Sequence, residues 1–135
     1  MRPTHALLAA LAAASVSSAA PAGDGLGPKS RLHPAAVGKA AGAEATATPD
    51  GVVRIGWPRT DVKVTVDGMP LAPFAGLGSW AAFTATDHGA MVMGDTVVFQ
   101  DEVTPAMDAA FENGLEVTAL HNHFFFDEPK VYFMH

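Results

Sequence analysis

Residues 101–123 read DEVTPAMDAAFENGLEVTALHNH and carry a helix signal, a stop signal and a strand signal in succession. Apolar side chains recur at spacings of three and four from Val103 onward, which predicts a helix over about residues 102–112. Asp101 is expected to cap the first turn of this helix, and Asn113-Gly114 is expected to end it. The segment therefore predicts a helix that leads directly into a strand.

The strand that follows, Leu115 to about Asn122, is apolar on both faces at its centre. Such a strand is typical of the middle of a sheet, where both faces are covered. Residues 90–99 form another predicted strand just before the helix, with Gly94-Asp95 as the expected site of a β-bulge. A strand, a helix and a strand in this order predict a right-handed βαβ crossover.

Most of the remaining chain has the composition of strands separated by turns. Residues 61–67 alternate valines with polar side chains, which is typical of a strand with one buried face. Asp67-Gly68 and Asp87-His88-Gly89 are turn signals. The further expected elements are a helix within residues 33–43 and strands at 52–57, 79–83 and 130–135. The predicted fold class is α+β, with a mixed, mostly antiparallel sheet and one well-defined helix.

The N-terminus has the layout of a secretory signal peptide. Arg2 precedes an apolar run of roughly 11 residues, which is too short to span a bilayer. Small residues and the sequence Ala20-Pro21-Ala22 follow, as at a cleavage site. We therefore expect a signal peptide at residues 1–22, a flexible linker at 23–31 and a single domain at 32–135, exported to the periplasm or secreted.

Composition excludes several kinds of function. The chain has no cysteine, so it has no disulfide, thiolate metal site or lipoprotein anchor. Its formal net charge of −6, without a cluster of Lys or Arg, argues against nucleic acid as a partner. No other stretch is long and apolar enough for a membrane span.

The residues best suited to chemistry are three histidines near the end of the chain. His121 and His123 are two residues apart on a predicted strand, so their imidazoles point the same way and could bind one metal ion. His135 could join them if the strand at 130–135 pairs with the strand at 115–123. Where paired residues sum to 254, His135 shares the face of His121; where they sum to 253, it points to the other face. The sequence leaves both registers open.

Neighbouring residues could support such a site. Asp127 and Glu128 could reach back from the loop as carboxylate ligands or as a general base, although a solvated acidic loop is the simpler interpretation. Three adjacent aromatics, Phe124, Phe125 and Phe126, could form a pocket wall or an interface. Elsewhere, Arg59 and Asp61 are expected to form a local salt bridge, and Glu102 is expected to cap the helix.

Several segments together resemble a known family. These are Trp57–Val64, Leu77–Phe83, Met93–Asp95, Asp101–Pro105 and Thr118–His123, followed by Pro129 and Met134-His135. In this order they resemble the LppY/LpqO-like family, named after mycobacterial probable lipoproteins, over roughly residues 32–135. The resemblance implies an exported bacterial domain of unknown function with the histidine segment as its hallmark.

The chain also differs from that family in two respects. Family members often continue beyond the position of His135, and their domains can occur in tandem, so the domain could be truncated at its C-terminus. The named lipoproteins carry an anchoring cysteine, which this chain lacks.

Three hypotheses follow for the function. The first is a metal-binding domain using Zn, Mn, Cu or Fe, with metal-dependent catalysis as an extension. The second is a non-catalytic module that binds a small ligand or a cell-envelope component. The third is a structural domain whose histidines hydrogen-bond locally. A second copy of the domain, or a homo-oligomer, is a further candidate partner.

Overall fold

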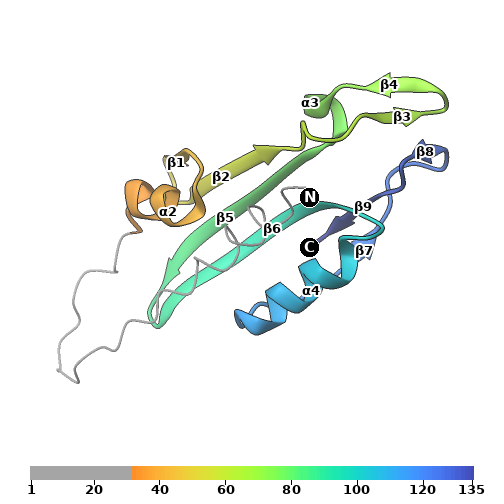
Figure 1. The fold of residues 1–135 in the computed structure, drawn as a ribbon. Helices are drawn as coiled ribbons and strands as arrows, with labels where there is room; N and C mark the ends of the chain where they lie inside the picture. Colours follow the sequence, from red (N-terminus) through yellow and green to blue (C-terminus); the bar gives the residue numbers. More distant parts are fainter. Residues whose placement is uncertain (1–31) are drawn as a thin grey trace, which may run out of the picture.

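The computed structural model describes residues 32–135 as an α+β fold of two antiparallel sheets and three helices (Figure 1). The predicted fold class is confirmed. The expected signal peptide at 1–22 and linker at 23–31 lie outside the described residues. The strands of the larger sheet, in spatial order, are β1 (Ala45–Ala47), β2 (Val53–Pro58), β5 (Gly78–Thr86), β6 (Gly89–Phe99), β9 (Val131–Met134) and β7 (Leu120–His121). The smaller sheet orders β4 (Met69–Leu71), β3 (Val64–Val66) and β8 (Asp127–Glu128), and the helices are α2 (Pro34–Ala41), α3 (Pro73–Gly76) and α4 (Val103–Glu112).

The long β5–β6 hairpin forms the centre of the larger sheet. Its register runs without interruption from the pair Thr86 and Gly89, next to the turn, to the pair Trp80 and Asp95. The bulge predicted at Gly94-Asp95 is therefore wrong. Gly94 is needed for a different reason, because a Cβ at this position would lie 3.0 Å from the backbone oxygen of Trp80.

The two helices of more than one turn pack on one face of this sheet, termed the helix face. Side chains alternate between faces along a strand, and paired residues share a face. Ile55 and Phe83 pack with Ala41 of α2, and Val98 and Met134 pack with Ala106 of α4. The helix face therefore contains one cluster under each helix.

The opposite face is covered by the smaller sheet at one end only. Val97, Phe99, Val131 and Phe133 point to this side and form a buried cluster with Val64 and with Leu77. In Figure 1 the strands β3, β4 and β8 lie together at the upper right. The turn between β3 and β4 is the expected Asp67-Gly68, with positive φ at both residues.

Helix α4 matches the helix predicted at residues 102–112, and one of the two acids expected to cap it lies at its N-cap. Glu102, and not Asp101, occupies the N-cap position, and the side chain of Glu102 makes no capping hydrogen bond there. The helix ends at Asn113 and Gly114, as predicted, with Gly114 at φ 73°. The helix expected within 33–43 is α2, which begins at a proline and ends before Gly42.

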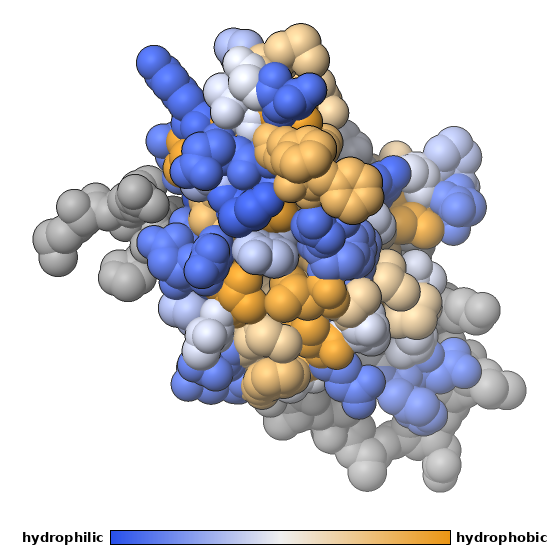
Figure 2. Space-filling model, turned by 90° about the vertical axis from the view of Figure 1, so that its right-hand side faces the viewer, coloured by the Kyte–Doolittle hydropathy of each residue, from blue (hydrophilic) through white to orange (hydrophobic). Residues whose placement is uncertain are grey.

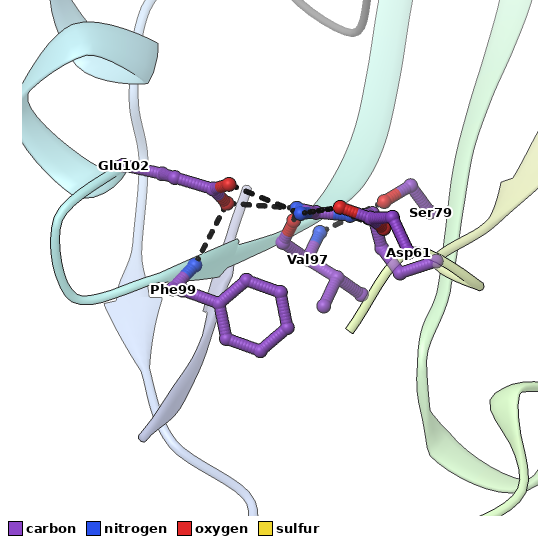
Figure 3. A network of polar contacts seen from close by, with 6 residues as sticks. Asp61, Ser79, Val97, Phe99 and Glu102 are labelled. Atoms are coloured by element: carbon purple, nitrogen blue, oxygen red, sulfur yellow. Dashed lines mark hydrogen bonds and ion pairs between the residues drawn. The ribbon is translucent and has the colours of Figure 1, made fainter. Parts of the chain in front are cut away.

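The side chain of Glu102 turns inward to a buried arginine (Figure 3). Its two carboxylate oxygens accept hydrogen bonds from Arg59 Nη1 at 2.8 Å and Nη2 at 3.0 Å, and one also accepts from the backbone N–H of Phe99. Arg59 also donates to Asp61, which confirms the expected local salt bridge, and to the backbone oxygen of Val97. This network ties the end of β2 to the β6–α4 turn.

The network keeps Arg59 charged despite its burial. Burial alone would lower the pKa of this guanidinium, but the hydrogen bonds and charges of Asp61 and Glu102 raise the pKa above its ordinary value. The guanidinium also lies 4.7 Å from the centre of the Phe99 ring. Arg59 is therefore a structural cation of the core.

The strand predicted at Leu115–Asn122 is wrong in extent and position. Only Leu120 and His121 form a strand, β7, and it lies at the edge of the sheet with exposed side chains. Both β6 and β7 pair antiparallel with β9, so they run in the same direction with β9 between them. The helix thus connects two parallel strands, as a βαβ crossover does, but those strands are not neighbours.

Candidate functional site

The pairing of β7 with β9 decides where His135 points. Leu120 faces Met134 and His121 faces Phe133, so paired residues sum to 254. The next pair in this register is Ala119 with His135, and the N–H of His135 donates to the backbone oxygen of Ala119 at 2.9 Å. This register places His121 and His135 on the same face, the one opposite the helices.

The side chains of His121 and His135 are in direct contact. Their Nε2 atoms are 2.9 Å apart, which is a hydrogen-bond distance. The ring centroids are 5.0 Å apart, so the rings meet almost head-on through these two atoms. One ring must donate its N–H and the other must accept, because two neutral imidazoles can share only one proton there.

The third predicted ligand, His123, belongs to the same group of rings. Its ring stacks on Phe133 with centroids 3.6 Å apart, and its centroid is 5.1 Å from that of His121. Phe133 is buried beneath, so it forms an apolar floor under both rings. The structure thus brings together all three histidines that the sequence indicated.

An acidic residue that the sequence analysis did not select lies beside them. The register of β6 with β9 pairs Thr96 with Met134, so the next pair is Asp95 with His135. Asp95 Oδ1 lies 3.9 Å from His135 Nε2. Among the described residues this buried oxygen has no hydrogen-bond partner, which is a costly state for a carboxylate. Because a bulge was expected at Gly94-Asp95, the sequence did not predict which face of β6 the side chain of Asp95 occupies.

The acids predicted to support the histidines lie elsewhere. Asp127 is buried in β8, where it accepts hydrogen bonds from Lys130 Nζ at 2.8 Å and from the backbone N–H of Val131 at 2.7 Å. Burial would raise the pKa of Asp127, but these two hydrogen bonds lower the pKa below its usual value. Glu128 is exposed in the same strand, opposite Thr65. Asp127 binds the N–H of Val131, which lies about 13 Å from His135 at about 3.3 Å per strand residue. Asp127 is therefore not placed to support His135.

The three phenylalanines divide between core and surface. Phe124 packs against the cluster that contains Phe133, with ring centroids 6.3 Å apart. Phe125 and Phe126 are 86% and 73% exposed. Figure 2 shows the side of the molecule that carries β8 and α4, where apolar groups are interrupted by hydrophilic ones.

A cavity of about 350 Å³ lies between the sheet and the C-terminal end of α4. Its apolar lining comes mainly from side chains of the helix face, including Ile55, Phe83, Val92 and Met134. Trp80, Met93 and His135 also border it, whereas Asp95, His121 and His123 do not. The cavity is therefore lined mainly from the helix face, and the histidine group meets it only at His135.

The side chains do not yet form a complete metal site. Within residues 32–135, no group of three or more His, Asp or Glu is already arranged to hold a metal ion. The head-on contact of His121 and His135 accounts for this, because their Nε2 atoms point at each other instead of at a common centre. No helix in this part of the chain is long and apolar enough to cross a membrane.

Two antiparallel sheets with helices on one face define the domain as α+β, and its residues 35–135 match the model of one protein family. The chain belongs to that family, described as Domain of Unknown Function (DUF1259). The resemblance to the LppY/LpqO-like family covers the same stretch and stays a prediction at that finer level. No curated protein and no solved structure matches the chain.

Proposed function

We propose that this domain binds a divalent transition-metal ion through His121, His123 and His135, with Asp95 as the carboxylate ligand. The observation that carries the proposal is the buried, unpartnered Oδ1 of Asp95 beside the contact between His121 and His135. A protein seldom leaves such an oxygen without a partner unless an ion or a water completes its environment. Imidazole and carboxylate ligands together suit Zn, Mn, Cu or Fe.

Distances support the proposal. Two nitrogens that each lie 2.0–2.1 Å from one ion are about 2.9 Å apart at a right angle and about 3.3 Å apart at a tetrahedral angle. The Nε2 atoms of His121 and His135 are already 2.9 Å apart. Binding then requires loss of the shared proton and a turn of each ring, without movement of the strands. Such an ion would supply Lewis acidity toward a bound water or substrate oxygen.

The test is the metal content of the full chain, purified without a histidine tag and dialysed against Zn²⁺, Mn²⁺, Cu²⁺ or Fe²⁺. We expect about one ion per chain, and a loss of affinity of at least about tenfold in His121→Gln, His135→Gln and Asp95→Asn. His88→Gln is the matched control, because His88 lies exposed in the β5–β6 turn. Absence of bound metal, or equal loss in the control, would overturn the proposal.

A second candidate is a non-catalytic module that binds a small ligand or a cell-envelope component. The exposure of Phe125 and Phe126 favours it, since these two adjacent aromatic side chains form an exposed apolar patch of the kind that marks a contact site. A cell-envelope binding assay on the same variants separates the two functions: a module of this kind keeps its partner when His121 and His135 are replaced, and loses it in Phe125→Ser with Phe126→Ser.

We also propose that the domain acts outside the cytoplasm. The support is the layout of residues 1–22, with a basic start, a short apolar run and a small-residue cleavage site. The mass of the protein recovered from the periplasm or medium of an expressing bacterium tests this. A mass lacking about the first 22 residues agrees with export, and full-length protein confined to the cytoplasm contradicts it.

A further inference from the structure

The sheet face that carries the histidines continues past Asp95 as an apolar surface that no helix or strand of residues 32–135 covers. Pairing in β2, β5, β6 and β9 places Gly56, Trp80, Asp95 and His135 in one row across the strands. The adjacent row contains Arg54, Ala82 and Met93. Trp80 is thus the direct neighbour of the carboxylate that we assign to the metal site.

This surface, which we call the Trp80 platform, consists of Trp80, Ala82, Met91 and Met93. Helices α2 and α4 pack on the other face, and the smaller sheet covers only the end near Phe133. Met91 and Met93 are 58% and 52% exposed. Methionine sulfur and the indole ring both make favourable contacts with flat aromatic groups.

The side chain of Arg54 lies over the Trp80 platform. The guanidinium carbon of Arg54 lies 5.0 Å from the centre of the Trp80 ring. Within residues 32–135 no carboxylate forms an ion pair with Arg54. A cation beside an apolar surface, with no carboxylate of the described residues paired to it, favours an anionic group there.

We propose that the Trp80 platform binds an organic anion with a flat, apolar body, which lies between Arg54 and the metal ion of the histidine site. This inference rests on the proposed function for the metal-binding end of the ligand only. Arg54 of β2 and His135, which follows β9, are three strand spacings apart, or about 14 Å at about 4.8 Å per spacing. Because the guanidinium of Arg54 lies over Trp80 of β5, the distance that a ligand has to bridge is two spacings, or about 10 Å. A fused aromatic ring with an acidic group at each end has that length.

The test uses three probes: 2-naphthoate, its neutral counterpart 2-naphthamide, and naphthalene-2,6-dicarboxylate. In metal-free protein, 2-naphthoate should bind about three- to fivefold more tightly than the amide, as expected for one exposed ion pair. Arg54→Met should abolish that difference. The matched control Lys39→Met, a cation in α2 on the helix face, should preserve it.

The location of the probe is read from the methyl resonances of methionines labelled with carbon-13. Binding at the Trp80 platform shifts Met91 without Met134, whereas binding in the cavity of the helix face shifts Met134; Met93 borders both places and reports on neither alone. Shifts confined to Met134 would overturn the proposal. Equal affinity for 2-naphthoate and 2-naphthamide would overturn it as well.

The metal-loaded protein tests the other end of the ligand. Naphthalene-2,6-dicarboxylate should bind about tenfold more tightly than 2-naphthoate when metal is present, and the gain should vanish in Asp95→Asn. If the wild-type chain holds no metal, the proposed function fails, while the effect of Arg54→Met in metal-free protein still decides the anion site. If metal binds and the dicarboxylate gains nothing, the bridging ligand is refuted while the metal site stands.

Discussion

Replacement of Glu102 by glutamine should strongly destabilise the domain, although it changes a single polar atom. The carboxylate accepts two hydrogen bonds from Arg59 and one from the N–H of Phe99, and its side chain is only 8% exposed. An amide turns one acceptor into a donor facing a donor, and it leaves Arg59 with one carboxylate partner, Asp61. Breaking a buried pair of this kind costs about 3–5 kcal/mol.

That cost is a large part of the total stability, because a domain of this size is stable by about 5–15 kcal/mol. Urea unfolding of the wild type, Glu102→Gln, Arg59→Met and the double variant would measure it. The double variant should lose less than the sum of the single variants, since it leaves no unpaired buried charge. The exposed Glu112, in the last turn of α4, provides the control Glu112→Gln, which should change stability by less than about 0.5 kcal/mol.

A loss below about 1 kcal/mol in Glu102→Gln, or strict additivity in the double variant, would refute this account of the network. Either result would mean that water replaces the lost carboxylate at little cost. The buried position of Arg59, and its contact with Phe99, would then need another explanation.

Three further predictions concern single residues. Asp127→Asn should cost about 1.5–3 kcal/mol at pH 7, because the carboxylate accepts hydrogen bonds from Lys130 and a backbone N–H. Folding lowers the pKa of Asp127, so its contribution to stability is fully present above the unfolded value of 3.8 and is lost as the pH falls through the folded pKa. The urea midpoints of the wild type and of Asp127→Asn should therefore converge in acid. Gly94→Ala should lower the thermal midpoint by an amount equivalent to about 1–3 kcal/mol, since its Cβ would press on the backbone of Trp80, and an unchanged midpoint would show that the strands yield easily. Asp95→Asn should raise the free energy of unfolding of the metal-free protein in urea at pH 8 by about 0.5–1 kcal/mol while weakening metal binding, because it removes a buried charge without a hydrogen-bond partner; a lower free energy of unfolding would show that Asp95 has a structural role.

Local patterns predicted the helix α4 and the turns because these depend on neighbouring residues. The hairpin turn at Asp87-His88-Gly89 and the end of α4 at Gly114 require backbone conformations that glycine favours. A glycine at each position therefore indicates the turn from the sequence alone. The strand at Leu115–Asn122 failed because apolar content does not distinguish a central strand from a segment packed under a helix. Val117 packs with α4 and Met134, so its burial comes from tertiary contacts.

The candidate site was predictable in its residues but not in its assembly. The spacing of His121 and His123 identified them, and either register was compatible with the sequence until the bond between His135 and Ala119 fixed one of them. Asp95 is 40 residues from His135 in the sequence and reaches it only through the pairing of β6 with β9. Such long-range registers carry no local sequence signature.

The position of β9 between β6 and β7 also constrains the order in which the domain can fold. Within residues 32–135 its only strand partners are β6 and β7, so it cannot pair until residues 131–134 have left the ribosome or the translocation channel. Until then β6 presents the unpaired edge of Val97, Val98 and Phe99, three side chains that are buried in the finished domain. An apolar edge of this kind is prone to association with other chains, so delayed synthesis of β9 should favour aggregation over folding.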